Sequence, residues 1–486
     1  MAQDTYDAAN FAGSDLNGTA RFVGMGGALG ALGGDISTMG TNPAGTGLMV
    51  RSEANFGLSG MFTDEKGQLG HDGSRASLDH AGVVFALDQF NRSDKGLQYI
   101  NVGVNYVKRR NHFGNMNTNV QNLNGMFSQT YQMAGLVADN YNAFGDDYDA
   151  WGTFSYFGEP MVTFQDEATG DFWGYDGTPA QAANYRRATY GSTSQADVNF
   201  SFNVSNRFYY GVTMGVYDVN YHRESSYWER GVDGMEYTFN NWYDTNGEGY
   251  DLKFGFICRP VENSPFRFGV AIHTPTWYRL EDVNGVDAFY DGARTADPES
   301  NAPFEYDYRT PWKFALSLGH TVGRTFAIGA EYEYSDYSTA KYEARDWANR
   351  DYFRAINDYT KDALKGVHTF KIGAEWKPDP SVAIRAGYNY VSSPFKNDAY
   401  RVIAFDSPFT ETDYTNWKGI NRFTVGVGFR FNGGYFDLAY QYQTQKGDFY
   451  AFDSYKVDQN GDVYIMKPTS VNNDRSQLLA TLGFRW

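Results

Sequence analysis

The chain has 486 residues, a net charge of −17 at pH 7, a single cysteine and an aromatic content of 17 %. One cysteine excludes an intramolecular disulfide, and therefore the small secreted domains that disulfides hold together. The negative charge argues against a nucleic-acid partner, and no run of about 18 apolar residues predicts a transmembrane helix. A membrane protein built from strands is not excluded, because a barrel strand needs only about 9–11 residues of alternating polarity.

Residues 1–50 form a distinct N-terminal segment, rich in glycine and small side chains. From Arg21 to Gly45 the sequence reads RFVGMGGALGALGGDISTMGTNPAG. Glycine loses much backbone entropy on folding and buries little surface, so such a segment becomes ordered only when another structure encloses it. Its glycine spacing misses the dinucleotide-binding fingerprint, and it is too short for a membrane helix. We therefore expect a plug of helical turns and loops inside the rest of the chain.

After the plug, segments of alternating apolar and polar residues recur to the last residue. In one of them Phe423, Val425 and Val427 alternate with polar or small residues, and the final segment ends in Trp486. Such alternation predicts strands with one apolar face. Fourteen strands are predicted: 52–62, 80–88, 98–109, 195–204, 208–221, 249–259, 265–274, 311–321, 325–337, 367–377, 382–391, 421–431, 435–445 and 476–486.

The connections between these strands sort by length. Every connection from an odd-numbered strand to the next is long, and those from even-numbered strands are mostly tight turns such as Asn432–Gly434. An even strand number, short turns at one end and long loops at the other are typical of an outer-membrane barrel, whereas a soluble β-sandwich has no reason to sort loops in this way. We predict an all-β fold: a 14-stranded antiparallel transmembrane β-barrel (51–486) with an N-terminal plug (1–50) in its lumen. Extracellular loops are expected chiefly at 110–194, 275–310 and 338–366, with both termini in the periplasm.

Two of the long loops carry local signals. Lys341–Leu364 places Trp347, Phe353, Ile356 and Leu364 at helical spacing, which predicts a surface helix. Asp458–Asp462 resembles a calcium loop but lacks the glycine and glutamate at the required positions. Its Asn-Gly pair instead predicts a hairpin turn between strands at 455–457 and 463–465.

The sequence shows no catalytic or metal-binding motif. The seven histidines are scattered without an i, i+4 pair, so we expect no enzyme, no metal and no cofactor. The beginning, Met1–Gln3, resembles the end of a signal-peptide cleavage site, so export with removal of a signal peptide near residue 2 or 3 is expected.

Alternation directs a set of charged side chains into the lumen. Most are expected to pair with one another and with the plug, and a few to bind the carboxylate or polar head of a ligand, a task suited to the fixed donors of arginine. The candidates are Arg267, Lys313, Glu331, Glu333, Lys371, Glu375, Arg385, Arg422, Arg430 and Arg485.

The chain resembles the long-chain fatty-acid transporter (FadL/TodX-like) family. The similarity lies in the plug residues Arg21, Gly24, Gly26, Asp35 and the tripeptide Asn42-Pro43-Ala44, and in barrel segments 269–278, 385–390 and 423–428. The resemblance implies a monomeric outer-membrane barrel whose plug, the hatch, gates the lumen through those residues. It also implies passive uptake of hydrophobic molecules and their sideways release through an inward kink of the third strand, within Gln98–Arg109.

The expected function is therefore passive uptake of hydrophobic or amphipathic, fatty-acid-like molecules across a bacterial outer membrane. The barrel would contact outer-membrane lipids and lipopolysaccharide. Two alternatives remain open on the same fold. One is a haem receptor, with His112 or His222 as iron ligand. The other is an accessory barrel subunit, whose long loops dock it into a larger envelope complex.

Overall fold

The computed structural model describes residues 4–486 except 66, 88–94, 124–127, 146, 148–162, 166–171, 176–179, 233, 291–292, 297–302, 346, 348–349, 402–410, 453–454 and 458–462. Among these residues, no helix is both long and apolar enough to cross a membrane.

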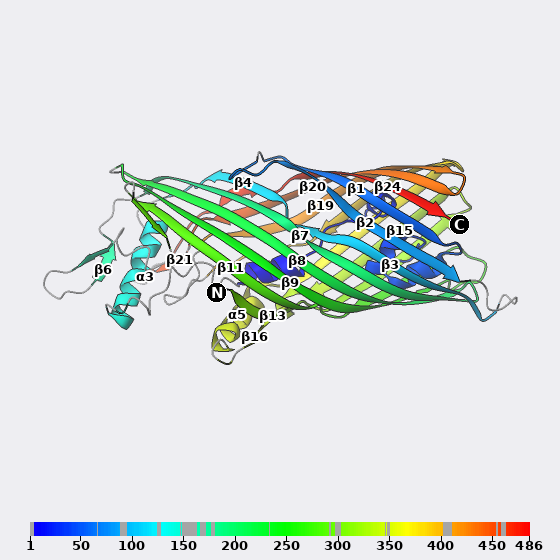
Figure 1. The fold of residues 1–486 in the computed structure, drawn as a ribbon, viewed down its shortest axis with the longest axis horizontal. Helices are drawn as coiled ribbons and strands as arrows, with labels where there is room; N and C mark the ends of the chain where they lie inside the picture. Colours follow the sequence, from blue (N-terminus) through cyan, green and yellow to red (C-terminus); the bar gives the residue numbers. More distant parts are fainter. Residues whose placement is uncertain are drawn as a thin grey trace.

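Fourteen antiparallel strands close into a barrel (Figure 1). The last strand pairs with the first over their whole lengths, from Glu53 opposite Arg485 to Thr63 opposite Arg475, so the ladder has no free edge. This confirms the predicted fold class. The barrel strands are β1 (Glu53–Thr63), β2 (Ser74–Leu87), β3 (Leu97–Asn111), β7 (Ala180–Val204), β8 (Phe208–Gly231), β9 (Glu236–Cys258), β10 (Arg267–His273), β14 (Lys313–Val322), β15 (Phe326–Asp336), β17 (Gly366–Asp379), β18 (Val382–Val391), β19 (Tyr414–Phe431), β20 (Gly434–Tyr450) and β24 (Arg475–Arg485).

The outer wall carries a band of exposed apolar side chains. On β19, Phe423 and Val425 are about half exposed, whereas Arg422 and Thr424, which alternate with them, are buried in the lumen. The same pattern recurs on β8 and β14. A closed barrel with an apolar belt outside and a polar interior is suited to a bilayer, because every backbone group of the belt is paired within the ladder.

Several strands continue far beyond this belt at the end that carries the long loops. Strands β7, β8 and β9 have 25, 24 and 23 residues, about twice what a bilayer requires. Much of the predicted loops 110–194, 275–310 and 338–366 is therefore regular structure, and the predicted strand ends at Tyr221 and Gly249 are wrong. The added strands are β4 (Gly114–Asn119), β11 (Trp277–Tyr290), β12 (Ala293–Ala296), β13 (Phe304–Arg309), β16 (Lys341–Ala344) and β23 (Thr469–Asn472).

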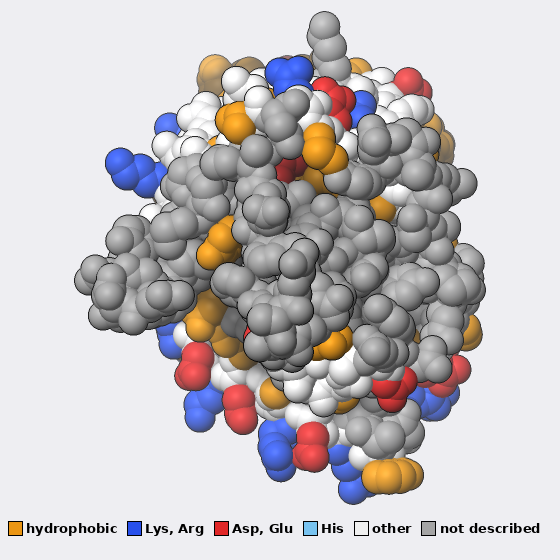
Figure 2. Space-filling model, turned by 90° about the vertical axis from the view of Figure 1, so that its left-hand side faces the viewer, with side chains coloured by type: hydrophobic (Ala, Val, Ile, Leu, Met, Phe, Trp, Pro, Cys, Tyr) orange, Lys and Arg blue, Asp and Glu red, His pale blue; other side chains and the backbone are white. Residues whose placement is uncertain are grey.

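Smaller elements complete the long-loop end, whose margin shows charged side chains of both signs (Figure 2). Helix α5 (Arg350–Ala363) confirms the predicted surface helix, although Trp347 lies before it and is 81 % exposed. The pairing of β21 (Tyr455–Val457) with β22 (Val463–Ile465) confirms the predicted hairpin, whose turn lies outside the described residues. Helix α3 (Gln129–Phe144), β5 (Thr163–Gln165), β6 (Phe172–Tyr175) and the short helix η4 (Tyr337–Thr339) are the remaining elements.

Residues 4–48, called the hatch below, lie inside the barrel (Figure 1). They form α1 (Thr5–Ala12), α2 (Ala20–Gly24), η1 (Ile36–Gly40) and η2 (Pro43–Leu48). A polar side chain begins each helix by accepting hydrogen bonds from its first turn: Asp4, Thr19, Asp35 and Asn42.

The two ends of the chain lie in different halves of the barrel. Strand β24 ends at the rim of the short turns, as predicted for the C-terminus. Helix α1 instead lies in the long-loop half, where Thr5 contacts Thr360 of α5. The first described residues therefore lie away from the short-turn rim, and the periplasmic position of both termini stays a prediction.

Candidate functional site

The body of the hatch is held backbone against backbone on the barrel wall. Gly329, Gly373 and Gly387 lie directly opposite one another on β15, β17 and β18. A Cβ atom on these glycines would lie 2.0 Å from the Ala28 carbonyl oxygen, 2.1 Å from that of Met25 and 2.3 Å from the amide nitrogen of Gly26. No side chain fits there, so these wall glycines permit the close approach of the hatch.

The Asn42-Pro43-Ala44 turn rests on a second pair of wall glycines. A Cβ atom at Gly211 would lie 2.2 Å from the Pro43 carbonyl carbon, and one at Gly255 would lie 2.2 Å from Oδ1 of Asn42. Oδ1 of Asn42 accepts a hydrogen bond from the Ala44 amide (3.2 Å), and its Nδ2 donates to the Phe256 carbonyl (3.4 Å). The tripeptide thus anchors the hatch to β8 and β9.

Charged residues join the hatch to the opposite wall. Arg21 lies 3.6 Å from Asp35 within the hatch and 3.2 Å from Glu375 of β17. Arg385 lies 2.7 Å from both Glu375 and Asp437. Burial opposes the charge on Arg21, but these carboxylates raise the pKa of its guanidinium above the ordinary value. Gly24 packs beside this network, against the Cβ of Arg385.

The other predicted lumen residues form a second cluster and scattered contacts. Lys313 pairs with Glu333 at 3.2 Å, and Lys371 pairs with Glu331 at 2.6 Å and with Glu333 at 3.4 Å. Arg267 donates to the carbonyl of Leu32 in the hatch (2.7 Å), and Arg485 pairs with Glu53 at the rim (2.6 Å). Arg430 is exposed near the end of β19, on the same strand face as Gly426 and Gly428 and opposite Tyr435 of β20, so its lumen position stays a prediction.

The pairing between β2 and β3 stops halfway up the barrel. The two strands pair from Leu87 opposite Ile100 to His80 opposite Val107. Beyond this point Ser74–Leu78 still pairs with β1, and Lys108–Asn111 still pairs with β7 after a bulge that leaves Arg109 unmatched. We call the unpaired boundary between Ser74–Asp79 and Lys108–Asn111 the seam.

The hatch takes the place of β2 along this part of β3. The Asp15 amide donates to the Arg109 carbonyl (3.0 Å), and Nδ2 of Asn17 donates to the Lys108 carbonyl (3.0 Å). The Asn111 amide donates to Oδ2 of Asp15 (2.9 Å). The link Gly13–Asn17 thus satisfies backbone groups that β2 leaves unpaired, as buried backbone requires.

Asp15 is also the centre of a charged cluster. It lies 3.4 Å from Arg475 and 3.7 Å from Arg422. Burial alone would raise the pKa of this carboxyl group, but Arg475, Arg110 and Arg422 lower it to about 2. Asp15 is therefore ionised at neutral pH and holds the link between Ile420 of β19 and the end of β3.

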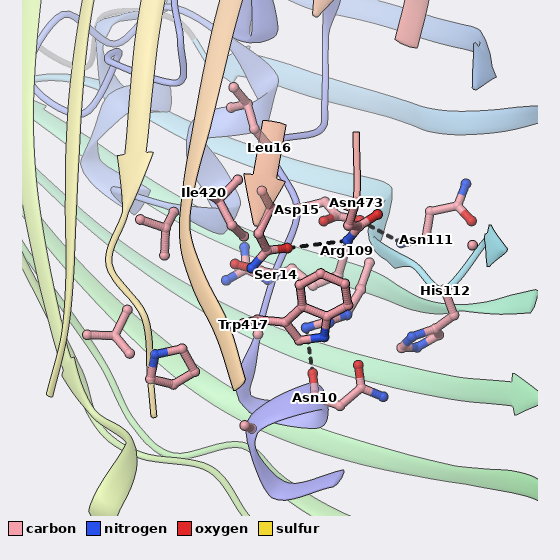
Figure 3. Close-up of a pocket in the computed structure, with 18 of the residues that line it drawn as sticks. Asn10, Ser14, Asp15, Leu16, Arg109, Asn111, His112, Trp417, Ile420 and Asn473 are labelled. Carbon is pink, nitrogen blue, oxygen red and sulfur yellow. Dashed lines mark hydrogen bonds between the residues drawn. The ribbon is translucent and has the colours of Figure 1, made fainter. Parts of the chain in front are cut away.

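Next to Asp15 the lumen holds a cavity of about 320 Å³ (Figure 3). It is bordered by α1, the link and the segments of β3, β14, β17 and β19 that face them. Its lining includes 11 lysine and arginine residues and 4 aspartate and glutamate residues. The cavity therefore favours negatively charged groups, although the whole chain is strongly negative.

The histidines proposed as haem ligands make other contacts. His112 is buried against Phe11 and Tyr221, with Nε2 3.0 Å from the Thr193 hydroxyl. Burial and Arg110 lower the pKa of His112 to about 3, so it is neutral. His222 contacts Asp244 through Nδ1 and Glu224 through Nε2 (3.0 Å). Both rings are thus engaged by the protein itself.

Asp15, Asn17 and the seam were not predicted from the sequence. The alternation of β3 identifies the strand but not the place where its neighbour leaves it. The partners of Asp15 lie about 95, 410 and 460 residues away, at Asn111, Arg422 and Arg475, so no local pattern connects them. The run Lys108-Arg109-Arg110 was an available signal, because three consecutive charges break the alternation.

Comparisons with known proteins show what the fold is similar to. A FadL homologue from Pseudomonas aeruginosa superposes with a TM-score of 0.52 and 11 % identity, covering 97 % of this chain and 99 % of that one. The Pseudomonas putida toluene transporter TodX gives 0.49 with 13 % identity, and the Ralstonia pickettii toluene transporter TbuX gives 0.48 with 11 %; each covers 97 % of this chain and 99 % of its own. No protein-family model matches the sequence, and no curated protein matches it. The whole chain thus shares its fold with the FadL homologue, as the resemblance in the hatch indicated.

Proposed function

We propose, from this shared fold, that the protein is a passive uptake channel for hydrophobic or amphipathic small molecules in a bacterial outer membrane. The apolar belt would lie in the bilayer, the short turns in the periplasm and the long-loop end outside the cell. Hydrophobic molecules need such a route because the polar lipopolysaccharide surface resists their entry, and a water-filled pore would not solvate them.

The seam between β2 and β3 is the observation that carries this proposal. It lies beside the cavity, and the link of the hatch covers it from within. A molecule that reaches the cavity has the hatch body below it, pressed against wall glycines, and the seam at its side. Sideways exit into the bilayer requires breaking three hydrogen bonds of the link and the ion pairs of Asp15 with Arg422 and Arg475, whereas passage to the short-turn end requires displacing the whole hatch body.

The charged lining of the cavity indicates which class of molecule the channel would take up. An excess of lysine and arginine in the lining suits an amphipathic molecule with an anionic head better than a plain hydrocarbon. Arg21, Gly24, Gly26, Asp35 and Asn42–Ala44 would then fix the hatch body, and movement would be confined to the link and α1. The paired lumen residues Lys313, Glu331, Glu333 and Lys371 would serve mainly to hold the interior.

Deletion of Arg109 tests this route. Arg109 has no partner on β7, so its loss lets Lys108 and Arg110 pair with the adjacent residues Ser194 and Thr193. We expect β3 to straighten and the seam to close, since a bulge bends its strand. Cells that lack their own fatty-acid channel and express this variant should lose uptake of a radiolabelled long-chain fatty acid.

Arg109→Ala is the matched control, because it removes the guanidinium but keeps the bulge. It should retain uptake of an uncharged long-chain alcohol. Equal uptake by the deletion variant and the wild type at equal surface levels would refute exit through the seam. No uptake by the wild type of either compound would refute the transport proposal and favour the accessory-subunit alternative.

A further inference from the structure

Lys108 of β3 is buried in the barrel wall without a partner for its charge. It is only 8 % exposed, whereas Val104 on the same strand is 49 % exposed. Among the described residues, none forms an ion pair or a hydrogen bond with its ammonium group. A buried ammonium group without a partner is costly, because it loses its hydration and gains no opposite charge. The position therefore calls for an anion that the described part of the chain does not supply.

Lys108 lies where the cavity meets the seam. It belongs to the lining of the cavity. The bulge of β3 begins after Lys108, so its side chain starts on the outward strand face that Val104 and Tyr106 share. Asp79 and Arg75 of β2 act on its charge from the other side of the seam. A molecule that leaves the cavity through the seam must therefore pass this ammonium group.

The carboxylate of Asp79 is engaged elsewhere and does not pair with Lys108. Asp79 is 1 % exposed and accepts hydrogen bonds from Nε2 of Gln477 (2.9 Å) and from the hydroxyl group of Ser77 (2.7 Å). Gln477 belongs to β24, on the opposite side of β2 from β3, so this bond directs the carboxylate away from the seam. Arg75 adds a second positive charge on the β2 side. Cations thus border the seam on both strands.

The lipid side of the seam is apolar beside this charge. Leu78 of β2 is 46 % exposed, and Val104 lies below Lys108 on the same face of β3. One cation next to such a surface suits an amphiphile, with its tail on the apolar side chains and its anionic head at the ammonium group. Lysine offers three donors to a carboxylate or phosphate oxygen.

We propose that Lys108 binds the anionic head group, a carboxylate or a phosphate, of an amphiphile that lies in the seam with its tail toward the apolar belt. The inference rests on the proposed uptake function and makes Lys108 a specificity-determining residue for sideways exit. Two sources supply this chemistry: the transported molecule on its way out, and a phospholipid of the membrane. An uncharged amphiphile gains nothing from the ammonium group, so exit favours anionic molecules.

Chemical labelling of lysine amines tests the site directly. The purified full-length protein is treated with dodecanal and cyanoborohydride, which alkylate lysine, and the labelled peptides are quantified by mass spectrometry. Lys341 is the internal reference, because it pairs with Glu343 on the surface (3.1 Å). Laurate should protect Lys108 about tenfold relative to Lys341, since a charge-assisted hydrogen bond is worth at least this factor, and dodecanol should not protect it.

A second competitor separates the two sources of the head group. Protection by laurate assigns the site to the transported class of molecule, and protection by dimyristoylphosphatidylglycerol alone assigns it to a membrane lipid. Both results support an anionic head group at Lys108. No protection by either anion, or equal protection by dodecanol, would overturn the inference.

Variants of Lys108 give a second test, in cells. Lys108→Met keeps the length of the side chain but removes its charge, so uptake of a radiolabelled long-chain fatty acid should fall about tenfold while uptake of a long-chain alcohol stays unchanged. Lys108→Arg keeps the charge and should retain both activities. Lys341→Met is the matched control and should behave as the wild type. Equal loss of both compounds in Lys108→Met, or no loss of either, would contradict the inference.

Thermal stability distinguishes binding from a structural role. Lys108→Met removes a buried charge that has no partner, so its heat-modifiable migration should persist to the same or a higher temperature than in the wild type. A lower temperature would show that Lys108 holds the wall together and would overturn the inference. If laurate protects Lys108 while the wild type takes up no fatty acid, the site stands and the transport proposal fails.

Discussion

Gly373→Ala should loosen the hatch without unfolding the barrel. The new Cβ would lie 2.1 Å from the Met25 carbonyl oxygen, whereas ordinary contact begins at 3.4 Å, so the hatch backbone must retreat by about 1 Å. Neither side can yield by changing a rotamer, because the atom that is struck belongs to the backbone. Overpacking of this kind costs about 1–3 kcal/mol, which lowers the ratio of seated to unseated hatch about 5- to 150-fold.

The assay is conductance of single barrels in planar bilayers, combined with the heat-modifiable migration that marks a folded barrel. Gly60→Ala is the matched control: it also lies in a barrel strand, but its added Cβ would meet its nearest neighbours, two ring atoms of Phe62, at an ordinary 3.5 Å. Gly373→Ala should show longer or more frequent open events than the wild type, and Gly60→Ala should match the wild type. Identical traces for the two variants would refute the claim that wall glycines seat the hatch.

Three further results are expected. Val427→Arg places a charge on the apolar belt and should lower the free energy of unfolding, measured in urea from lipid, by about 2–4 kcal/mol. Gly428→Arg points inward beside Asp437 and should change conductance more than stability. Equal losses of stability in the two variants would show that the predicted register is wrong. Burial and Asp4 raise the pKa of Asp7, so docking of α1 is strongest when Asp7 is protonated and weakens as the pH rises through that raised value. Asp7→Asn should therefore abolish the increase in binding of the apolar probe 1-N-phenylnaphthylamine as the pH rises, and an unchanged pH profile would contradict this. Deletion of Phe484–Trp486 removes pairing partners of Glu53 and Ala54 and should abolish folded protein in the membrane; normal folded yield would argue against closure by β24.

Strand number and order could be predicted from the sequence, because every strand of the belt must alternate apolar side chains toward the lipid with polar side chains toward the lumen. On β8 the side chains of Tyr210, Val212, Met214 and Val216 face outward, as the alternation predicted. Beyond the belt the apolar side chains change sides: Tyr217, Val219 and Tyr221 are buried in the lumen and their neighbours outside are polar. The predicted strand ended at Tyr221, shortly after this change of phase, although the chain continues as the same strand to Gly231.

The site residues could be predicted from the sequence only in part. Arg21, Asp35, Glu375 and Arg385 do meet in one network, because a buried charge in a closed lumen must find an opposite charge. Asp15 was missed, because its role depends on where β2 separates from β3. That separation coincides with a bulge in β3 and with the hatch link, which pairs with β3 from a distant part of the sequence.

The central claim is that a hydrophobic molecule leaves the lumen sideways through the seam. The most direct test is photo-crosslinking of a long-chain fatty acid with a diazirine in its chain, followed by mapping of the labelled peptides by mass spectrometry. We expect label on Lys108–Asn111 of β3 and on Ser74–Asp79 of β2. Label on the short-turn side of the hatch, around Leu48 and Met49, would show passage straight through the barrel and would contradict it.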